Sequence, residues 1–292
     1  MIDYNVLRSW PFGKRVHAYD ERDVMLYALG CGFGFDPMDE GQLAFVHETR
    51  LRVVPSLAAV IGTPGSWWRL PGTGVTWQKV LHAEQDLHLF RELPVTAAMT
   101  AENAVTHLHD RGAGRGAVAR LVRDIFDEAG NRVAQARRIE ILRDDGGFAK
   151  ESGVHDEAPP RLPAIPPDAG EPDIVVRLPT VPQAALIYRL SGDPNPLHAD
   201  PAVAREAGFP RPILHGLCSF GMATHALLRG LLDYVPERLS RIGVRFSAPV
   251  FPGETLRFGI WREGIGAARF RAWVEERQLL VLDNGIAEFD RR

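Results

Sequence analysis

Alternation of apolar and polar residues predicts antiparallel strands in both halves of the chain. The clearest case is the run RFRAWV at 269–274, which alternates as a strand covered on one face does. Each half ends in three strand-like runs, at 102–109, 116–126 and 132–142, and at 254–261, 267–275 and 279–289. Each set follows a strand that runs into a proline-containing bend, at 87–95 and 244–252.

Fewer segments have a helical pattern. Residues 217–232 (LCSFGMATHALLRGLL) are apolar on nearly every face, which predicts a buried helix. Asp20 is a candidate N-cap for a short helix in the first half. Thr180, with Gln183 three residues later, forms a capping-box pattern before a short helix in the second half. Asp200, followed by proline, predicts the start of another short helix.

A proline-rich segment divides the chain. Residues 153–173 (GVHDEAPPRLPAIPPDAGEPD) combine prolines and charges with few large aliphatic residues, so we expect an extended linker without a core of its own. This predicts an N-terminal domain at 1–152 and a C-terminal domain at 174–292. Both domains are large enough to form a core.

The two halves have the same order of predicted elements. The segment YALGCG at Tyr27 aligns with YRLSGD at Tyr188, and each closes a short helix after an extended segment. A helix followed by an antiparallel meander, repeated twice, predicts an α+β fold in which the sheet wraps around the buried helix.

Composition narrows the class of protein. The net charge is −3 and the basic residues are scattered, which argues against nucleic acid as a main partner. Cys31 and Cys218 lie in apolar stretches without metal-ligand spacing, so we interpret them as reduced core thiols. The sequence shows no signal peptide and no run of ~18 apolar residues, so we expect no membrane insertion and a cytoplasmic location.

The loop SGDPNPLH places potential acid–base groups in a stiffened segment. Its two prolines fix their own φ angles and favour extended conformations at Asp193 and Asn195. The loop therefore cannot continue a helix and should hold Asp193, Asn195 and His198 in a nearly constant geometry. Acid–base catalysis requires such positioning.

The buried helix follows the histidine–glycine pair at 215–216. The first amides of a helix have no internal partners, so the N–H groups of Gly216 and Leu217 are free to act as donors. Backbone donors of this kind stabilise a carbonyl oxygen that gains negative charge. We therefore expect Gly216 to lie beside the Asp/His loop.

Together these motifs resemble the MaoC-like dehydratase family. The segment YRLSGDPNPLH at 188–198 and the later LHG carry the resemblance. Within the family they are similar to the (R)-specific 2-enoyl-CoA hydratases, or hydratase 2, many of which are double hot dogs built from one chain. This resemblance implies two antiparallel sheets, each wrapped around a central helix, that join into one continuous sheet.

The resemblance also implies a hydro-lyase reaction, the reversible syn hydration of trans-2-enoyl-CoA to (R)-3-hydroxyacyl-CoA. Asp193 and His198 would form the dyad that activates water, and Asn195 would support it. The backbone N–H of Gly216 would bind the thioester oxygen. The resemblance implies no metal or redox cofactor, and the CoA moiety belongs to the substrate. The family commonly dimerises, so a homodimer is expected.

The first half lacks the site residues. When Tyr27 is aligned with Tyr188, Gly32 falls at the position of Asp193 and Pro37 at that of His198. The short apolar stretch 54–62 stands where the second half has its long helix. We expect a catalytic second half and a first half that widens the acyl pocket.

Other functions remain open at this point. A hot-dog thioesterase would need a carboxylate on the central helix, and 217–232 contains none. A non-catalytic subunit that binds acyl thioesters or docks a partner would not need the Asp/His pair. The first-half histidines lack metal-ligand spacing, so we expect no metal at His82, His88, His107 and His109.

Overall fold

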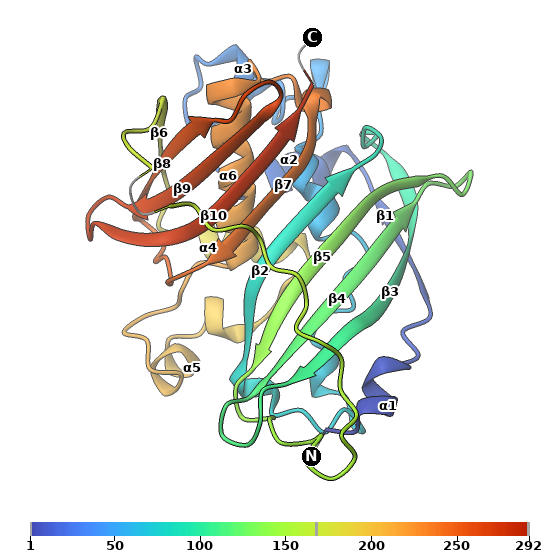
Figure 1. The fold of residues 1–292 in the computed structure, drawn as a ribbon. Helices are drawn as coiled ribbons and strands as arrows, with labels where there is room; N and C mark the ends of the chain where they lie inside the picture. Colours follow the sequence, from blue (N-terminus) through green and yellow to red (C-terminus); the bar gives the residue numbers. More distant parts are fainter. Residues whose placement is uncertain (1, 167–168, 291–292) are drawn as a thin grey trace.

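The computed structural model describes residues 2–166 and 169–290. Within these residues each half contributes five strands (Figure 1). The strands are β1 (Lys14–Tyr19), β2 (Val80–Leu89), β3 (Ala97–Asp110), β4 (Ala117–Phe126), β5 (Arg132–Leu142), β6 (Ile174–Pro179), β7 (Leu239–Phe246), β8 (Thr255–Arg262), β9 (Ala267–Val274) and β10 (Leu279–Phe289). The three strand-like runs predicted at the end of each half correspond to β3–β5 and β8–β10.

The ten strands form one continuous sheet, as predicted. Their order is β1-β3-β4-β5-β2-β7-β10-β9-β8-β6, and every neighbouring pair is antiparallel. The second half repeats the strand order of the first, so β2 and β7 are equivalent strands. These two pair with each other from Glu84 opposite Arg245 to His88 opposite Arg241. The joint between the halves is therefore a regular antiparallel ladder.

The helices confirm the predicted asymmetry between the halves. In the second half α6 (Gly216–Leu231) lies against the sheet, and every residue from 218 to 228 is buried (Figure 1). In the first half the stretch 54–62 contains only the short 3-10 helix η2 (Pro55–Ala59), which contacts α6, β2 and β5. The remaining α-helices are α1 (Tyr4–Arg8), α2 (Glu21–Gly30), α3 (Glu40–Leu43), α4 (Ala184–Tyr188) and α5 (Pro201–Glu206).

The two aligned tyrosines meet where the halves pack together. Tyr27 lies in the last turn of α2 and Tyr188 ends α4, and their buried rings lie 5.8 Å apart between centroids. Gly30 allows this approach, because a Cβ atom there would lie 3.3 Å from the Tyr188 ring. The alignment made from sequence thus corresponds to a contact between equivalent positions.

Two local predictions have different outcomes. Asp20 caps α2 and forms a capping box with Asp23, as the first expectation required. The capping box predicted at Thr180 is wrong, because Gln183 is the N-cap of α4 and no side chain caps that helix. The Thr180 hydroxyl instead donates to the Glu254 carbonyl oxygen at 2.8 Å and accepts a bond from the Gly253 amide at 2.8 Å. It ties the end of β6 to the turn before β8.

The proline-rich segment has neither a helix nor a strand among its described residues. It nevertheless contributes to the interior, because Leu162 and Ile165 are buried. Arg161 in this segment forms a 2.7 Å ion pair with Glu84 of β2. The segment therefore binds the sheet close to the joint between the halves.

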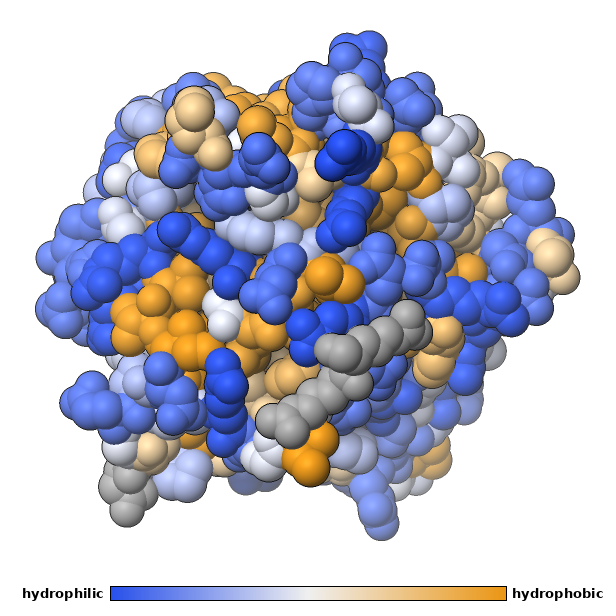
Figure 2. Space-filling view, turned by 90° about the horizontal axis from the view of Figure 1, so that it is seen from above, coloured by the Kyte–Doolittle hydropathy of each residue, from blue (hydrophilic) through white to orange (hydrophobic). Residues whose placement is uncertain are grey.

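The surface mixes polar and apolar residues. Seen from the end where the C terminus lies, apolar residues gather in patches bordered by hydrophilic ones (Figure 2). Among the exposed large apolar side chains are Leu186 and Leu190, at and just after α4.

No helix among the described residues is both long and apolar enough to cross a membrane. Cys31 and Cys218 are buried free thiols, as predicted.

Candidate active site

The predicted site loop contains the end of one short 3-10 helix, η5 (Arg189–Ser191), and all of a second, η6 (Pro196–His198). Gly192 closes η5 with φ of 107°, a left-handed conformation that favours glycine. The Asp193 carboxylate accepts a hydrogen bond from the Asn195 amide at 3.2 Å. The Asn195 side chain in turn accepts one from the Leu197 amide at 3.1 Å and caps η6. These local bonds set the position of His198 relative to Asp193.

His198 is buried and has a defined orientation. Its Nδ1 lies 2.9 Å from the carbonyl oxygen of Ile213. A carbonyl can only accept, so Nδ1 carries the proton and Nε2 of the neutral ring is left with a free lone pair. Burial lowers the pKa of His198 below its usual value of 6.5, although the Ile213 carbonyl and the Asp193 carboxylate oppose the shift. The residue is therefore poised to accept a proton at neutral pH.

His215 also belongs to this cluster, and our sequence predictions did not include it. Its ring stacks on that of His198, with centroids 3.8 Å apart and planes 28° apart. Its Nε2 lies 3.2 Å from the carbonyl oxygen of Asp193, to which it donates. Burial, reinforced by the neighbouring His198, lowers the pKa of His215 to about 4, against the opposing effect of Asp193. One clue was available: histidine replaces the usual Ser, Thr, Asp or Asn as N-cap of α6 and makes no side-chain cap.

The side chains of Asp193, His198 and His215 converge. One oxygen or nitrogen atom from each lies within 4.8 Å of the others. Within residues 2–166 and 169–290 this is the only group of His, Cys, Asp and Glu side chains placed to hold a metal ion. A carboxylate and two imidazoles are a set that zinc accepts, and the same set can bind and deprotonate a water molecule.

Gly216 places a free amide at the start of α6. Neither its N–H nor that of Leu217 has an acceptor among the described residues, and Gly216 is exposed. The helix N-terminus adds partial positive charge at this point. A Cβ atom at position 216 would lie 3.3 Å from the ring of Phe246 on β7, so glycine suits this close approach. The amide is next in sequence to His215 and hence beside the cluster.

The equivalent region of the first half has no comparable cluster. Gly32 has φ of 81° and carries no side chain, and Pro37 is exposed. The two positions thus offer no group that can transfer a proton. The acid–base groups that the loop motif predicted are confined to the second half.

Comparison with known proteins identifies the family. Residues 167–283 match the MaoC like domain, and residues 17–143 match the MFE-2 hydratase 2 N-terminal domain. The chain is 38% identical over 281 residues to 3-hydroxyacyl-thioester dehydratase Y of Mycobacterium tuberculosis, covering 93% of each protein. It is 36% identical over 282 residues to peroxisomal enoyl-CoA hydratase 2 of Arabidopsis thaliana, covering 91% of this chain and 89% of that protein.

A solved structure agrees with these matches along the whole chain. The MaoC-like dehydratase from Phytophthora capsici superposes with a TM-score of 0.85 and 30% identity, covering 100% of both chains. A protein of Mycobacterium tuberculosis described as a double hot dog fold superposes with a TM-score of 0.54 at 16% identity, which supports the fold alone. The chain belongs to the MaoC-like dehydratase family, with the two-domain organisation of hydratase 2.

Proposed function

We propose that this protein catalyses the reversible hydration of trans-2-enoyl-CoA to (R)-3-hydroxyacyl-CoA. The observation that carries the proposal is the convergence of Asp193 and His198 beside the free amide of Gly216. The family membership of the chain supports it, since relatives named enoyl-CoA hydratases match over both halves. The reaction uses no metal or redox cofactor, and the CoA thioester is the substrate.

The geometry suggests how the reaction proceeds. Asp193 and His198 bind one water molecule, and one of them takes its proton while the water oxygen forms a bond to C3 of the alkene. The dyad then delivers that proton to C2, so it regains its starting proton count. The Gly216 N–H donates to the thioester oxygen, which becomes enolate-like as the C2–C3 double bond is lost. Asn195 supports the dyad by capping η6, the 3-10 helix that carries His198.

A single water held by both catalytic groups restricts the stereochemistry. The hydroxyl and the new C2 hydrogen then arrive on one face of the alkene, so addition is syn. His198 holds its free nitrogen toward the cluster because Nδ1 is bound to the Ile213 carbonyl. Which face of the alkene lies over the dyad is assigned from the family, and it gives the (R) product.

The two halves have different roles in this proposal. Residues 174–292 form the catalytic domain, residues 153–173 the linker, and residues 1–152 the domain that receives the acyl chain. We also propose a homodimer, for which exposed apolar residues such as Leu186 and Leu190 offer contact surface. A cytoplasmic location is proposed for this chain, although the Arabidopsis relative is named peroxisomal.

Two alternative functions fit less well. A hot-dog thioesterase needs a carboxylate on the central helix, and α6 contains no acidic residue from Gly216 to Leu231. A non-catalytic subunit that binds acyl thioesters would have no use for the ordered Asp193 and His198 pair. The hydratase is therefore the function that the site supports best.

The test is the loss of enoyl-thioester absorbance when the purified protein is mixed with 2-enoyl-CoA of several chain lengths. Asp193→Asn and His198→Gln should each lower the rate by about 10²- to 10⁴-fold, the usual contribution of a positioned acid or base. Asp200→Asn is the matched control, because Asp200 only caps α5 and asparagine caps equally well. The proposal fails if either dyad variant keeps more than about a tenth of the activity.

A further inference from the structure

The inner face of the first-half sheet carries charged and polar side chains where the second half packs its central helix. On β4, Arg123 lies between the buried residues Leu121 and Ile125 of the same face. Across the ladders, Arg123 is opposite Asn103 of β3, and Gln85 of β2 is opposite Arg138 of β5. Gln85 and Arg123 are both buried. This polar set separates the main apolar core from a smaller apolar cluster around Trp67 and Leu108.

Of the two arginines in this polar set, only Arg138 has a carboxylate partner in the described part of the chain. Arg138 lies 3.3 Å from the Glu140 carboxylate, which also accepts a bond from the Trp68 indole. Arg123 forms no ion pair with any carboxylate of residues 2–166 or 169–290, and it donates only to the Ala59 carbonyl oxygen. Burial, with a contribution from nearby Arg138, lowers the pKa of Arg123 to about 9, so it stays charged at neutral pH. A buried cation without a counter-ion is costly.

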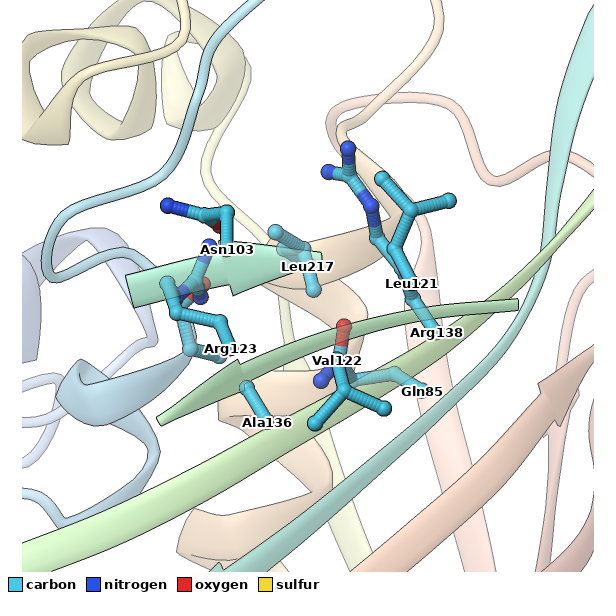
Figure 3. A pocket seen from close by; sticks show the side chains of 9 residues that line it. Gln85, Asn103, Leu121, Val122, Arg123, Ala136, Arg138 and Leu217 are labelled. Atoms are coloured by element: carbon cyan, nitrogen blue, oxygen red, sulfur yellow. The ribbon is translucent and has the colours of Figure 1, made fainter. Parts of the chain in front are cut away.

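Two hydrogen-bond donors in this region are also unused. The Nε of Arg123 and the Nε2 of Gln85 are buried and have no acceptor among the described residues. Buried polar groups are nearly always bonded, so each exception requires an explanation. Both side chains line the same cavity, which is the region shown in Figure 3. There Arg123 and Asn103 rise side by side from adjacent strands, with Leu217 across from them.

The size and place of the cavity limit what it can hold. The unfilled space between the lining residues is about 280 Å³ when the adjoining open solvent is included, but the cavity itself has a volume of only about 10 Å³. That is room for one water-sized group, so a larger group such as a carboxylate enters only when the lining side chains move apart. Leu217 lines the cavity and directly follows Gly216, the proposed thioester donor. The cavity therefore adjoins the start of α6, where the thioester is proposed to bind.

We propose that the cavity is a subsite for a terminal carboxylate on the acyl chain, so that the preferred substrates are enoyl-CoA thioesters of dicarboxylic acids. This rests on the proposed hydratase function and names its substrate class. A carboxylate supplies the acceptors that Arg123 and Gln85 lack and the negative charge that Arg123 lacks. A methyl end would leave both donors unbonded, and a neutral ketone would leave the charge uncompensated.

The experiment compares pairs of substrates that differ only at the end of the chain. Each trans-2-enoyl-CoA is assayed beside the same chain ended by a carboxylate, over short to medium lengths. At one length or more, kcat/KM for the carboxylate-ended chain should exceed that of its partner by about tenfold or more, the contribution of a hydrogen bond to a charged group. Arg123→Met should abolish this preference, and Gln85→Leu should reduce it. Arg120→Met, on β4 but outside the cavity, is the matched control.

Several results would overturn the subsite. It fails if the wild-type protein prefers the uncharged partner at every length, or if Arg123→Met leaves the preference unchanged. Arg123→Met removes a buried charge that has no ion-pair partner in the described chain, and thermal unfolding checks that each variant keeps its fold. Calorimetric binding of saturated dicarboxylyl-CoA and matched acyl-CoA tests the subsite without catalysis. If no enoyl-CoA is hydrated but the carboxylate-ended ligand binds better through Arg123, the hydratase proposal fails and the subsite stands.

Discussion

His198 and His215 stack with ring centroids 3.8 Å apart, and each ring bonds through one nitrogen to a backbone carbonyl. The two carbonyls belong to Ile213 and Asp193, on either side of the cluster. The stack therefore links the loop that carries Asp193 to the segment that leads into α6. Burial lowers the pKa of both rings below the usual 6.5, and the neighbouring His198 lowers that of His215 further, so both imidazoles are held neutral near pH 7.

We predict that His215→Phe lowers kcat by about tenfold, with little effect on KM. Phenylalanine keeps a ring against His198 but cannot donate to the Asp193 carbonyl, so the carboxylate loses one restraint on its position. Steady-state kinetics on one enoyl-CoA checks this, with circular dichroism to show that the fold is kept. An unchanged kcat would mean that His215 only fills space.

The pH dependence follows from the pKa of His198. Folding lowers this pKa below 6.5, so the neutral, proton-accepting form persists below that pH. We predict that kcat/KM is at its plateau at neutral pH and falls on the acid side with a midpoint below 6.5. A pH–rate profile of the wild-type protein measures the midpoint. An acid limb centred above pH 6.5 would rule out His198 as the group that must be neutral.

Gly216 offers a test that separates crowding from chemistry. Gly216→Ala keeps the amide but places a methyl group 3.3 Å from the Phe246 ring, tighter than most real contacts. We expect kcat to fall by about tenfold, because a displaced donor stabilises the enolate-like oxygen less well. Adding Phe246→Leu should restore most of the loss. If the single variant is fully active, the close packing at this position has no part in catalysis.

Asp86 joins the two halves at the β2–β7 ladder. Its carboxylate accepts two bonds from Arg241, at 2.9 and 3.2 Å, and lies 3.2 Å from His88. Burial alone would raise the pKa of Asp86, but the bonds from His88 and Arg241 lower it overall. We predict that Asp86→Asn lowers the free energy of unfolding by about 2–4 kcal/mol, because it leaves Arg241 partly unpaired in a part-buried site.

The control is Glu275→Gln, which breaks a more exposed pair with Arg177 and should cost less than about 1 kcal/mol. The contribution of Asp86 also depends on pH. Because folding lowers its pKa, the stabilisation is complete above the ordinary carboxyl range and is lost as pH falls through the folded-state pKa. Denaturant unfolding at neutral and acid pH should show the Asp86→Asn difference shrinking in acid. Equal effects of the two variants at neutral pH would contradict this role.

Most of the fold could be predicted from the sequence because its strands have local patterns. The run at 279–289 corresponds to all of β10, and the apolar run at 217–232 corresponds to α6 within one residue. The capping box at Thr180 could not be excluded locally. The Thr180 hydroxyl bonds to Glu254, which is 74 residues away. The sequence around the helix does not indicate so distant a partner.

The site was only partly predictable for the same reason. Asp193 and His198 lie in one short loop, so their spacing alone indicates proximity. His215 lies beyond α5 in the sequence. It comes close to Asp193 and His198 only because the chain folds back after that helix. Arg123 was missed because Arg120 and Arg123 share one strand and the alternation does not show which of them faces inward. The structure places Arg123 inward, opposite Asn103.

The stereochemistry of the product tests the central claim most directly. If Asp193 and His198 hold one water while Gly216 holds the thioester oxygen, hydration gives a single enantiomer of 3-hydroxyacyl-CoA, which the family assigns as (R). Coupling the reaction to an (R)-specific 3-hydroxyacyl-CoA dehydrogenase should therefore produce NADH, and coupling to an (S)-specific enzyme should produce none. A strong signal with the (S)-specific enzyme would contradict the assignment of these residues and of the reaction.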